Sequence, residues 1–209
     1  LTNCVFLTSS FYHLAAQPGI SSATPFDVYL NDNIIATYRL LEVSKDIKTL
    51  KLFVNIATSS IYGKFAKSPE EKAPEPFSYY GVSKLAAEQM VLAYNRDYHK
   101  LPACSFRLYS VYGERERPEK VYPKLIKSIL EGSEFTLFEG SDKHERSFTY
   151  VGDIVLGLVL AVENIEKCVG QIFNIGSDTV ITTGEGIKIV ESIMGKNANI
   201  KVIEKRTGD

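Results

Sequence analysis

Short apolar runs alternate along this chain with segments whose apolar residues recur at helical spacing. Residues 52–57 (LFVNIA) form the most compact apolar run, and residues 103–111 form another. Helical patterns at 28–44 and 79–99 separate these runs. Strands that alternate with helices are typical of a layered α/β fold. We therefore expect a layered α/β fold.

The second half of the chain has a less regular pattern. We expect Asp153 to N-cap an apolar helix, and glycines to end two other helices. The further elements expected are strand pieces at 5–8 and 11–15, helices at 122–130, 154–162 and 183–194, and strands at 135–138, 171–175 and 200–203.

Charge and cysteine content exclude several classes of protein. The 209 residues include 24 Lys and Arg against 25 Asp and Glu, so the formal net charge is −1. This balance gives no attraction to nucleic acid or to an anionic membrane, and we expect neither as a partner. Cys4, Cys104 and Cys168 are scattered, which argues against a disulfide framework or a metal site. A reducing compartment fits best, so we expect a cytoplasmic protein.

Tyr80 and Lys84 form the sharpest local signal. They stand four residues apart at the start of an expected helix, so the phenol and the ammonium share one face. A neighbouring ammonium lowers the pKa of a phenol toward usefulness as a general base. An exposed tyrosine beside a solvated lysine is the alternative interpretation of the pair.

Three hydroxyl residues, Thr58, Ser59 and Ser60, directly follow the apolar run at 52–57. In an α/β sheet the ligand crevice lies at such strand ends, so a hydroxyl here can bind a substrate oxygen. A turn or a helix cap is the structural alternative.

The chain resembles the extended short-chain dehydrogenase/reductases, in the group of NAD-dependent sugar-nucleotide epimerases and dehydratases. Seven segments carry the resemblance in the order of that family. They are HLAAQPG at 13–19, ATSSIYG at 57–63, YYGVSKLAAE at 79–88, RLYSVYGERERP at 107–118, RSFTYVGD at 146–153, NIG at 174–176 and RTGD at 206–209.

The resemblance implies an α/β fold with a Rossmann-like, doubly wound parallel sheet and a smaller C-terminal substrate domain, which together bind NAD and a nucleotide sugar. It implies that Tyr80 is the catalytic base, that Lys84 activates it and holds the nicotinamide ribose, and that Thr58 binds the substrate sugar. His13 is implied to be structural. The other cofactor-binding residues it implies are Leu14, Ala15, Ala16, Asn33 and Tyr109. Those implied to contact the substrate are Ser59, Ser60, Ser110, Arg146, Arg206 and Asp209, and an arginine fork suits a diphosphate.

The chain also departs from the family pattern. It has no glycine-rich turn of the type that cradles a pyrophosphate. About two β-α units, on the order of 60 residues, are therefore expected to be absent. Because the chain begins at Leu1, we expect it to be part of a longer protein. Ser110 stands where the family usually has Asn, and Ser147 where it often has Asp.

Ser59 and Ser60 bear on the choice among the chemistries of the family. Dehydratases carry an Asp-Glu pair at these two positions, and decarboxylases usually carry a Glu at the second. Without a carboxylate to move further protons, elimination is disfavoured. We therefore expect an epimerase that inverts C4 of a UDP-hexose or UDP-hexuronate through a keto-sugar. A dehydratase or decarboxylase, and a non-catalytic nucleotide-binding protein, are the alternatives.

We expect two domains and a homodimer. Residues 1–113 would be the remainder of the dinucleotide-binding domain. Residues 114–209 would mainly bind substrate, with 151–176 returning to the first sheet. The resemblance implies a homodimer in which the helices near 33–44 and 79–99 pack against their copies as a four-helix bundle.

Overall fold

The computed structural model describes residues 10–19, 23–63 and 68–204, which fold into two compact units. The first unit contains the described residues up to Tyr109 together with Asp153–Ile175. The second contains Ser110–Gly152 and the described residues from Gly176 onward. The strand piece expected at 5–8, and the candidate residues Arg206 and Asp209, lie outside the described residues.

A four-stranded parallel sheet forms the centre of the first unit. Its order is β1-β2-β3-β7, and its strands are β1 (Ser10–His13), β2 (Leu52–Thr58), β3 (Ala103–Leu108) and β7 (Ile172–Ile175). Strands covered on both faces have near-continuous rather than alternating apolar sequence. This explains the run at 52–57, where Leu52, Phe53 and Val54 are all fully buried.

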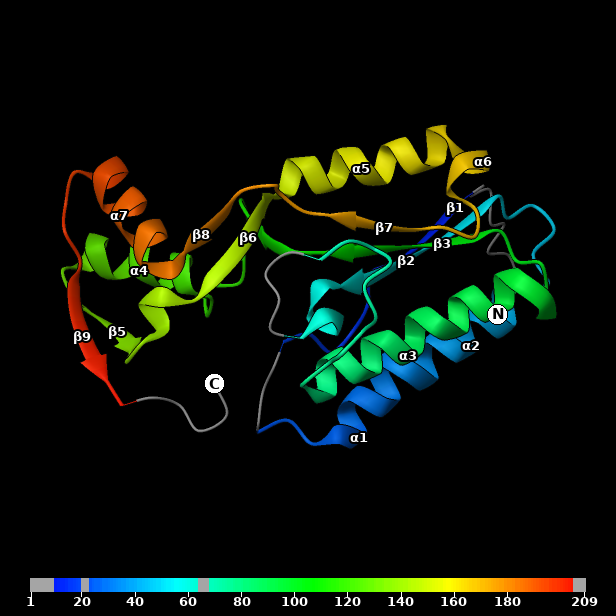
Figure 1. The fold of residues 1–209 in the computed structure, drawn as a ribbon, viewed down its shortest axis with the longest axis horizontal. Helices are drawn as coiled ribbons and strands as arrows, with labels where there is room; N and C mark the ends of the chain where they lie inside the picture. Colours follow the sequence, from blue (N-terminus) through cyan, green and yellow to red (C-terminus); the bar gives the residue numbers. More distant parts are fainter. Residues whose placement is uncertain (1–9, 20–22, 64–67, 205–209) are drawn as a thin grey trace, which may run out of the picture. The chain divides into compact units, whose positions relative to one another are not determined.

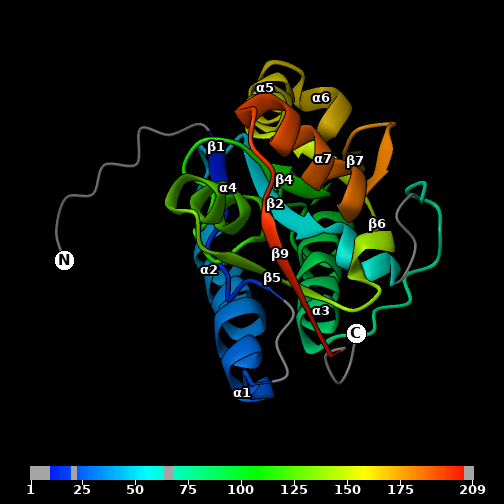
Figure 2. The same cartoon turned by 90° about the vertical axis from the view of Figure 1, so that its left-hand side faces the viewer.

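Helices cover both faces of this sheet, so the predicted doubly wound α/β arrangement is confirmed. Figure 1 shows α2 (Ala36–Ser44) and α3 (Tyr79–Ala93) on one face, and α5 (Val151–Glu163) and α6 (Ile165–Cys168) on the other. The view in Figure 2 also shows α2 beside α3.

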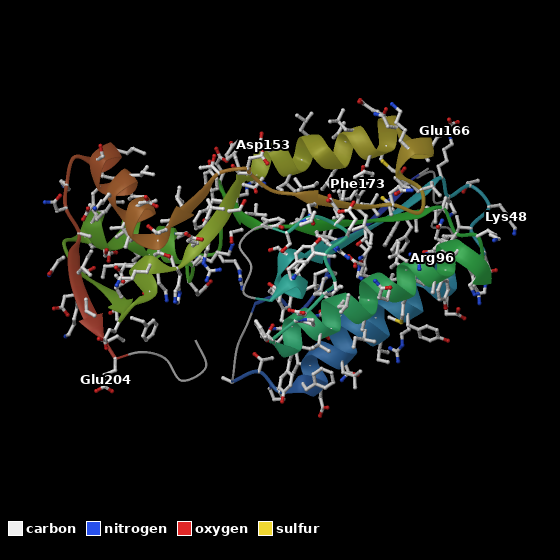
Figure 3. All side chains as sticks on the ribbon, in the orientation of Figure 1. Lys48, Arg96, Asp153, Glu166, Phe173 and Glu204 are labelled. Atoms are coloured by element: carbon white, nitrogen blue, oxygen red, sulfur yellow. The ribbon has the colours of Figure 1, made fainter. Side chains whose placement is uncertain are left out.

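Each face of the sheet has its own apolar core. Leu41, Phe53 and Val91 belong to the cluster under α2 and α3. Phe106 belongs to the cluster under α5, where it stacks on Phe173 with the ring centroids 5.4 Å apart, a spacing typical of aromatic pairs. Figure 3 labels Phe173 on β7, on the side of the sheet that α5 covers.

The two helices under the sheet contain π-helical stretches. The helix expected at 28–44 consists of α1 (Phe26–Tyr29), the π-helix η1 (Leu30–Ile35) and α2. The helix expected at 79–99 consists of α3 followed by the π-helix η3 (Tyr94–Tyr98). Such stretches occur frequently at functional sites, and Asn33 is buried within the first of them.

The second unit is built from two small sheets and two main helices. One sheet has the order β4-β6-β8, and the other pairs β5 with β9 in parallel. The core contains Leu125, Ile129, Phe135 and Ile187. Its elements are β4 (Ser110–Tyr112), α4 (Val121–Glu131), β5 (Glu134–Phe138), η4 (Ser141–Lys143), β6 (Glu145–Tyr150), β8 (Val180–Thr182), α7 (Thr183–Met194) and β9 (Asn199–Ile203).

Local sequence explains the limits of α7. Thr182 and Glu185 form a capping box at its start, and Gly195 follows its end in the left-handed conformation that favours glycine. The expectation for α5 was wrong in one detail. This helix begins at Val151, so Asp153 lies inside its first turn instead of at the N-cap, where the carboxylate still complements the helix dipole.

The single strand expected at 103–111 is divided between the two units. β3 ends at Leu108, whereas Ser110 begins β4 and pairs with Phe148 of β6. The second unit therefore begins at Ser110, before the boundary expected between residues 113 and 114. No helix in the described ranges is long and apolar enough to cross a membrane.

Candidate active site

The hydroxyl cluster forms a tight turn at the carboxyl end of β2. Thr58 is extended and N-caps the 3-10 helix η2 (Ser59–Tyr62), with its hydroxyl oxygen accepting from the backbone N–H of Ser60 at 3.2 Å. The Thr58 hydroxyl donates to Ser60 Oγ, also at 3.2 Å. The Ser60 hydroxyl accepts this bond, so its own proton is available to donate.

Tyr80 and Lys84 lie in the first two turns of α3. Ser78 caps this helix by accepting from the backbone N–H of Gly81 at 3.0 Å. The helical spacing places the phenol and the ammonium on one face, as the sequence predicts. Tyr80 is half-buried, and its ring lies 6.4 Å from the ring of Tyr29, measured between centroids.

Lys84 is buried, and the Glu88 carboxylate offsets only part of the cost of burying its charge. Only 3% of the residue is exposed, and burial lowers the pKa of its amine to about 8, although the Glu88 carboxylate opposes this shift. Within the described part of the chain, Lys84 has no hydrogen-bond or ion-pair partner. A buried amine with three donors and no acceptor is expensive to maintain. It is therefore suited to a ligand that brings hydroxyl or phosphate oxygens.

Asn33 connects the segment after β1 to the helix that carries Tyr80. Its side-chain oxygen accepts from the backbone N–H of Gln17 at 2.7 Å, and its amide nitrogen donates to Ser83 Oγ at 2.9 Å. Ser83 in turn donates to the backbone oxygen of Tyr80. Leu14, Ala15 and Ala16 precede Gln17, and Leu14 and Ala15 are exposed.

His13 occupies the end of β1 and is buried. Its Nε2 lies 2.8 Å from Thr37 Oγ1, and Thr37 donates its own proton to the backbone oxygen of Asn33. His13 Nε2 must therefore carry the proton of that bond. Burial, and then the Lys84 charge, lower the pKa of His13 to about 4, so the imidazole is neutral at pH 7.

Tyr109 follows β3 and contacts a nearby loop. Its phenol donates to the backbone oxygen of Ser68 at 3.1 Å and accepts from the N–H of the same residue at 3.2 Å. Burial raises the pKa of the Tyr109 phenol. His13, Thr58 and Leu108 all end parallel strands of one sheet, so the segments after them meet at the carboxyl edge where α/β proteins bind ligands.

The remaining described candidates belong to the second unit. Ser110 is half-buried on β4, and Arg146 is exposed on β6. Ser147, beside it, is buried and donates to the backbone oxygen of Ser177 at 2.7 Å. The charge of Arg146 also reaches Tyr122, where it opposes the effect of burial, which raises the pKa of that phenol.

The family model for the NAD dependent epimerase/dehydratase family matches residues 8–176. This chain belongs to that family. The resemblance inferred from the sequence motifs is therefore confirmed. The match covers both elements that carry the candidate centre, the turn after β2 and the start of α3.

Individual relatives and solved structures give the same result. The uncharacterized UDP-glucose epimerase YtcB of Bacillus subtilis (strain 168) is 34% identical over 95% of this chain and 62% of its own length. UDP-glucuronate 4-epimerase 5 of Arabidopsis thaliana is 33% identical over 98% of this chain and 51% of its own. The chain thus spans about half to two thirds of the length of these relatives. A crystal structure of UDP-glucuronic acid 4-epimerase from Bacillus cereus, in complex with UDP-glucuronic acid and NAD, superposes with a TM-score of 0.88 at 35% identity, covering 96% of this chain and 64% of that chain.

This epimerase/dehydratase family member also has a buried polar network that the sequence reasoning missed. The Arg107 guanidinium on β3 donates to both carboxylate oxygens of Glu88 on α3, at 2.7 and 3.0 Å, and to the hydroxyl of Tyr62. Tyr62 donates to the side-chain oxygen of Asn174 on β7 at 3.0 Å. An arginine in the middle of the apolar run at 103–111 is the signal that could have revealed it, because a buried charge requires a partner.

Proposed function

We propose that this chain carries the catalytic centre of an NAD-dependent epimerase that inverts C4 of a nucleotide sugar, a UDP-hexose or UDP-hexuronate. The observation that carries the proposal is the buried, unpartnered Lys84 ammonium on the same helix face as Tyr80. The names of the relatives support a UDP-sugar as substrate and C4 as the position.

The residues present fit a dinucleotide. Lys84 would supply a desolvated ammonium for the hydroxyls of the nicotinamide ribose, and burial is the cause of its lowered pKa. The segment of Leu14, Ala15 and Ala16 would lie along the dinucleotide, with Asn33 holding the end of that segment and Tyr109 following β3 at the same carboxyl edge of the sheet. When bound, NAD supplies the hydride acceptor for the sugar carbon.

The chain's own groups would handle the proton and the orientation of the sugar. Tyr80 would take the proton of the C4 hydroxyl and return it after the opposite face of the sugar is presented. Thr58 and Ser60 would hold the sugar oxygens. At positions 59 and 60 the chain offers serines without a carboxylate, so it lacks there the acid and base that elimination requires.

We assign the nucleotide part of the substrate to the second unit. Ser110 and Arg146 would contact it, with Arg146 forming a bidentate contact to the diphosphate. Arg206 and Asp209 would complete the set. In this proposal residues of the first unit bind the dinucleotide and the sugar, and residues of the second bind the nucleotide part of the substrate.

We also propose a cytoplasmic homodimer that uses the outer faces of α2 and α3. Tyr38 and Val43 on α2 and Val82 on α3 are exposed apolar side chains on neighbouring helices. A copy packing against them would form a four-helix bundle. Light scattering of the full-length protein should give twice the mass of one chain, and Val43→Asp should give one chain mass. A monomeric parent would contradict this arrangement.

Product analysis tests the activity. The full-length protein is incubated with UDP-glucuronate and with UDP-glucose, and the products are resolved by NMR and mass spectrometry. We expect a C4-inverted sugar of unchanged mass without net formation of NADH. Loss of water would instead establish a dehydratase, and loss of carbon dioxide a decarboxylase. No turnover together with retained nucleotide binding would establish a non-catalytic binding protein.

A further inference from the structure

The hydroxyl turn and the residues that lead into α3 closely approach the α carbon of Gly81. A β carbon built there would lie 2.9 Å from the backbone oxygen of Ser60, 3.0 Å from Cβ of Pro76 and 3.4 Å from Oγ of Ser78. The first of these belongs to the hydroxyl turn and the last to the cap of α3. Gly81 is buried and directly follows Tyr80. The helix that carries the phenol therefore approaches the hydroxyl turn more closely than any side chain would allow.

Backbone conformation does not explain this glycine. Gly81 is not among the residues with positive φ and lies in regular α-helix, where alanine is favoured over glycine. Space is the property that distinguishes glycine here. The close neighbour is a backbone oxygen, which cannot rotate away as the end of a flexible side chain can.

Hydrogen bonds hold the segments that surround Gly81, here called its walls, in place. Ser60 lies in a turn closed by the Thr58 cap, and its backbone oxygen accepts from the N–H of Gly63. Pro76 ends the segment 68–76, here called the strap. Near its end, the N–H of Glu75 donates to the backbone oxygen of Ile61 at 2.8 Å, which joins the strap to the same turn.

The far end of the strap is anchored to the sheet. Arg107 donates to the backbone oxygen of Glu70 at 3.0 Å, and Asn174 donates to that of Ser68 at 2.8 Å. The Glu70 carboxylate accepts from the backbone N–H of Asn174 at 2.7 Å. A group added at Gly81 therefore meets anchored walls, and the start of α3 is the part that must shift.

From this geometry we propose that Gly81 is a positioning residue, which sets the separation between Tyr80 and the Thr58–Ser60 turn. The role of that separation in turnover rests on the proposed epimerase function. Gly81 touches no substrate in this account. It acts by allowing the base and the hydroxyls to contact one sugar at the same time.

Gly81→Ala tests the proposal, with Gly157→Ala as a matched control. Gly157 is also helical, and a β carbon there would lie 2.9 Å from an atom, but that atom is the Cδ1 end of the Ile175 side chain, which can move. In the full-length protein we expect Gly81→Ala to lower kcat by about 10- to 100-fold, because small misplacements of reacting groups cost that much. KM for the UDP-sugar should change little, and Gly157→Ala should retain the parental kcat.

A second readout does not depend on activity. Crystal structures of the parent and of Gly81→Ala should differ in the separation between Cα of residue 81 and the Ser60 oxygen, which should lengthen in the variant. An unchanged separation, or an unchanged kcat in an active enzyme, overturns the proposal. If the parent turns over no sugar nucleotide, the proposed function fails, and the separation still decides the role of Gly81.

If Gly81→Ala does not fold, Pro76→Gly replaces it. This variant removes one wall and adds no atom at Gly81, so it loosens the same contact. We expect it to lower kcat with KM nearly unchanged. A parental kcat in Pro76→Gly would overturn the proposal.

Discussion

The side-chain amide of Asn33 donates a 2.9 Å hydrogen bond to the hydroxyl of Ser83, although the two residues are 50 positions apart in the chain. Because Asn33 also binds both backbone groups of Gln17, it joins the segment after β1 to the first turns of α3. The proposed dinucleotide-binding segment and the proposed base are thereby held by one buried side chain.

Tyr80→Phe removes the proton-transferring hydroxyl and keeps the ring. We expect kcat to fall by about 100- to 10,000-fold, the range typical of a lost general base. Affinity for the nucleotide sugar, measured by calorimetry, should remain close to that of the parent. Tyr79→Phe is the matched control, since Tyr79 is exposed and precedes Tyr80 in the same helix. Unchanged turnover in Tyr80→Phe would remove this residue from the mechanism.

Lys84→Met should abolish turnover and stabilise the nucleotide-free protein. Burial lowers the pKa of Lys84 from 10.5 to about 8, so between these values the unfolded chain binds more protons. The parent should therefore gain stability relative to the variant as the pH rises from 8 to 10.5. At pH 7 the variant should have the larger free energy of unfolding, by up to about 3 kcal/mol. Denaturant unfolding at several pH values measures this difference.

An exposed lysine provides the control for that experiment. Lys48, labelled in Figure 3, is exposed in the segment before β2. Lys48→Met should leave the free energy of unfolding, and its pH dependence, within about 0.5 kcal/mol of the parent. A Lys84→Met variant that is less stable than the parent at pH 7 would contradict a net unfavourable burial of the Lys84 ammonium.

His13→Gln should make the protein less sensitive to mild acid. Burial and the Lys84 charge lower the pKa of His13 from 6.5 to about 4, so the parent loses stability as the pH falls between these values. The loss attributable to His13 amounts to at most about 3 kcal/mol. A glutamine amide can still donate to Thr37 and does not titrate. Equal acid sensitivity of His13→Gln and of the exposed-site control His144→Gln would contradict this.

Glu88→Ala should be strongly destabilising, because it leaves the Arg107 guanidinium buried without its partner. Such a loss costs about 3–5 kcal/mol. The double variant Glu88→Leu with Arg107→Met, which removes both charges, should cost less than Glu88→Ala alone. The ion pair of Lys201 and Glu134 is the control, since both side chains are more than half exposed, at 59% and 55%, and Lys201→Ala should cost less than about 1 kcal/mol. Thermal and denaturant unfolding give all three values.

Apolar runs and helical spacing, which are short-range sequence patterns, predicted most of the fold. The apolar run at 52–57 gave the buried central strand, and Thr183–Met194 is a helix with the predicted limits. The division of residues 103–111 was not predictable, because Ser110 leaves the first sheet to pair with Phe148, a contact between segments far apart in the chain. A continuous apolar pattern does not reveal a change of sheet.

The sequence predicted the part of the candidate site whose residues are close together in the chain. Tyr80 and Lys84 share a face because of helical geometry alone. The partner of Arg107 was not predictable, since its ion pair with Glu88 joins a strand to a helix and an arginine in an apolar run does not reveal which carboxylate it contacts. Gly81 was likewise missed, because a glycine in a helical pattern carries no signal of the turn that approaches it.

The isotopic fate of C4 tests the central claim most directly. UDP-glucuronate deuterated at C4 is incubated with the full-length protein in ordinary water, and the product is examined by NMR. If Tyr80 removes a hydroxyl proton while the carbon-bound hydrogen stays within the site, the C4-inverted product retains its deuterium. Loss of deuterium to water, or inversion at another carbon, would contradict the account.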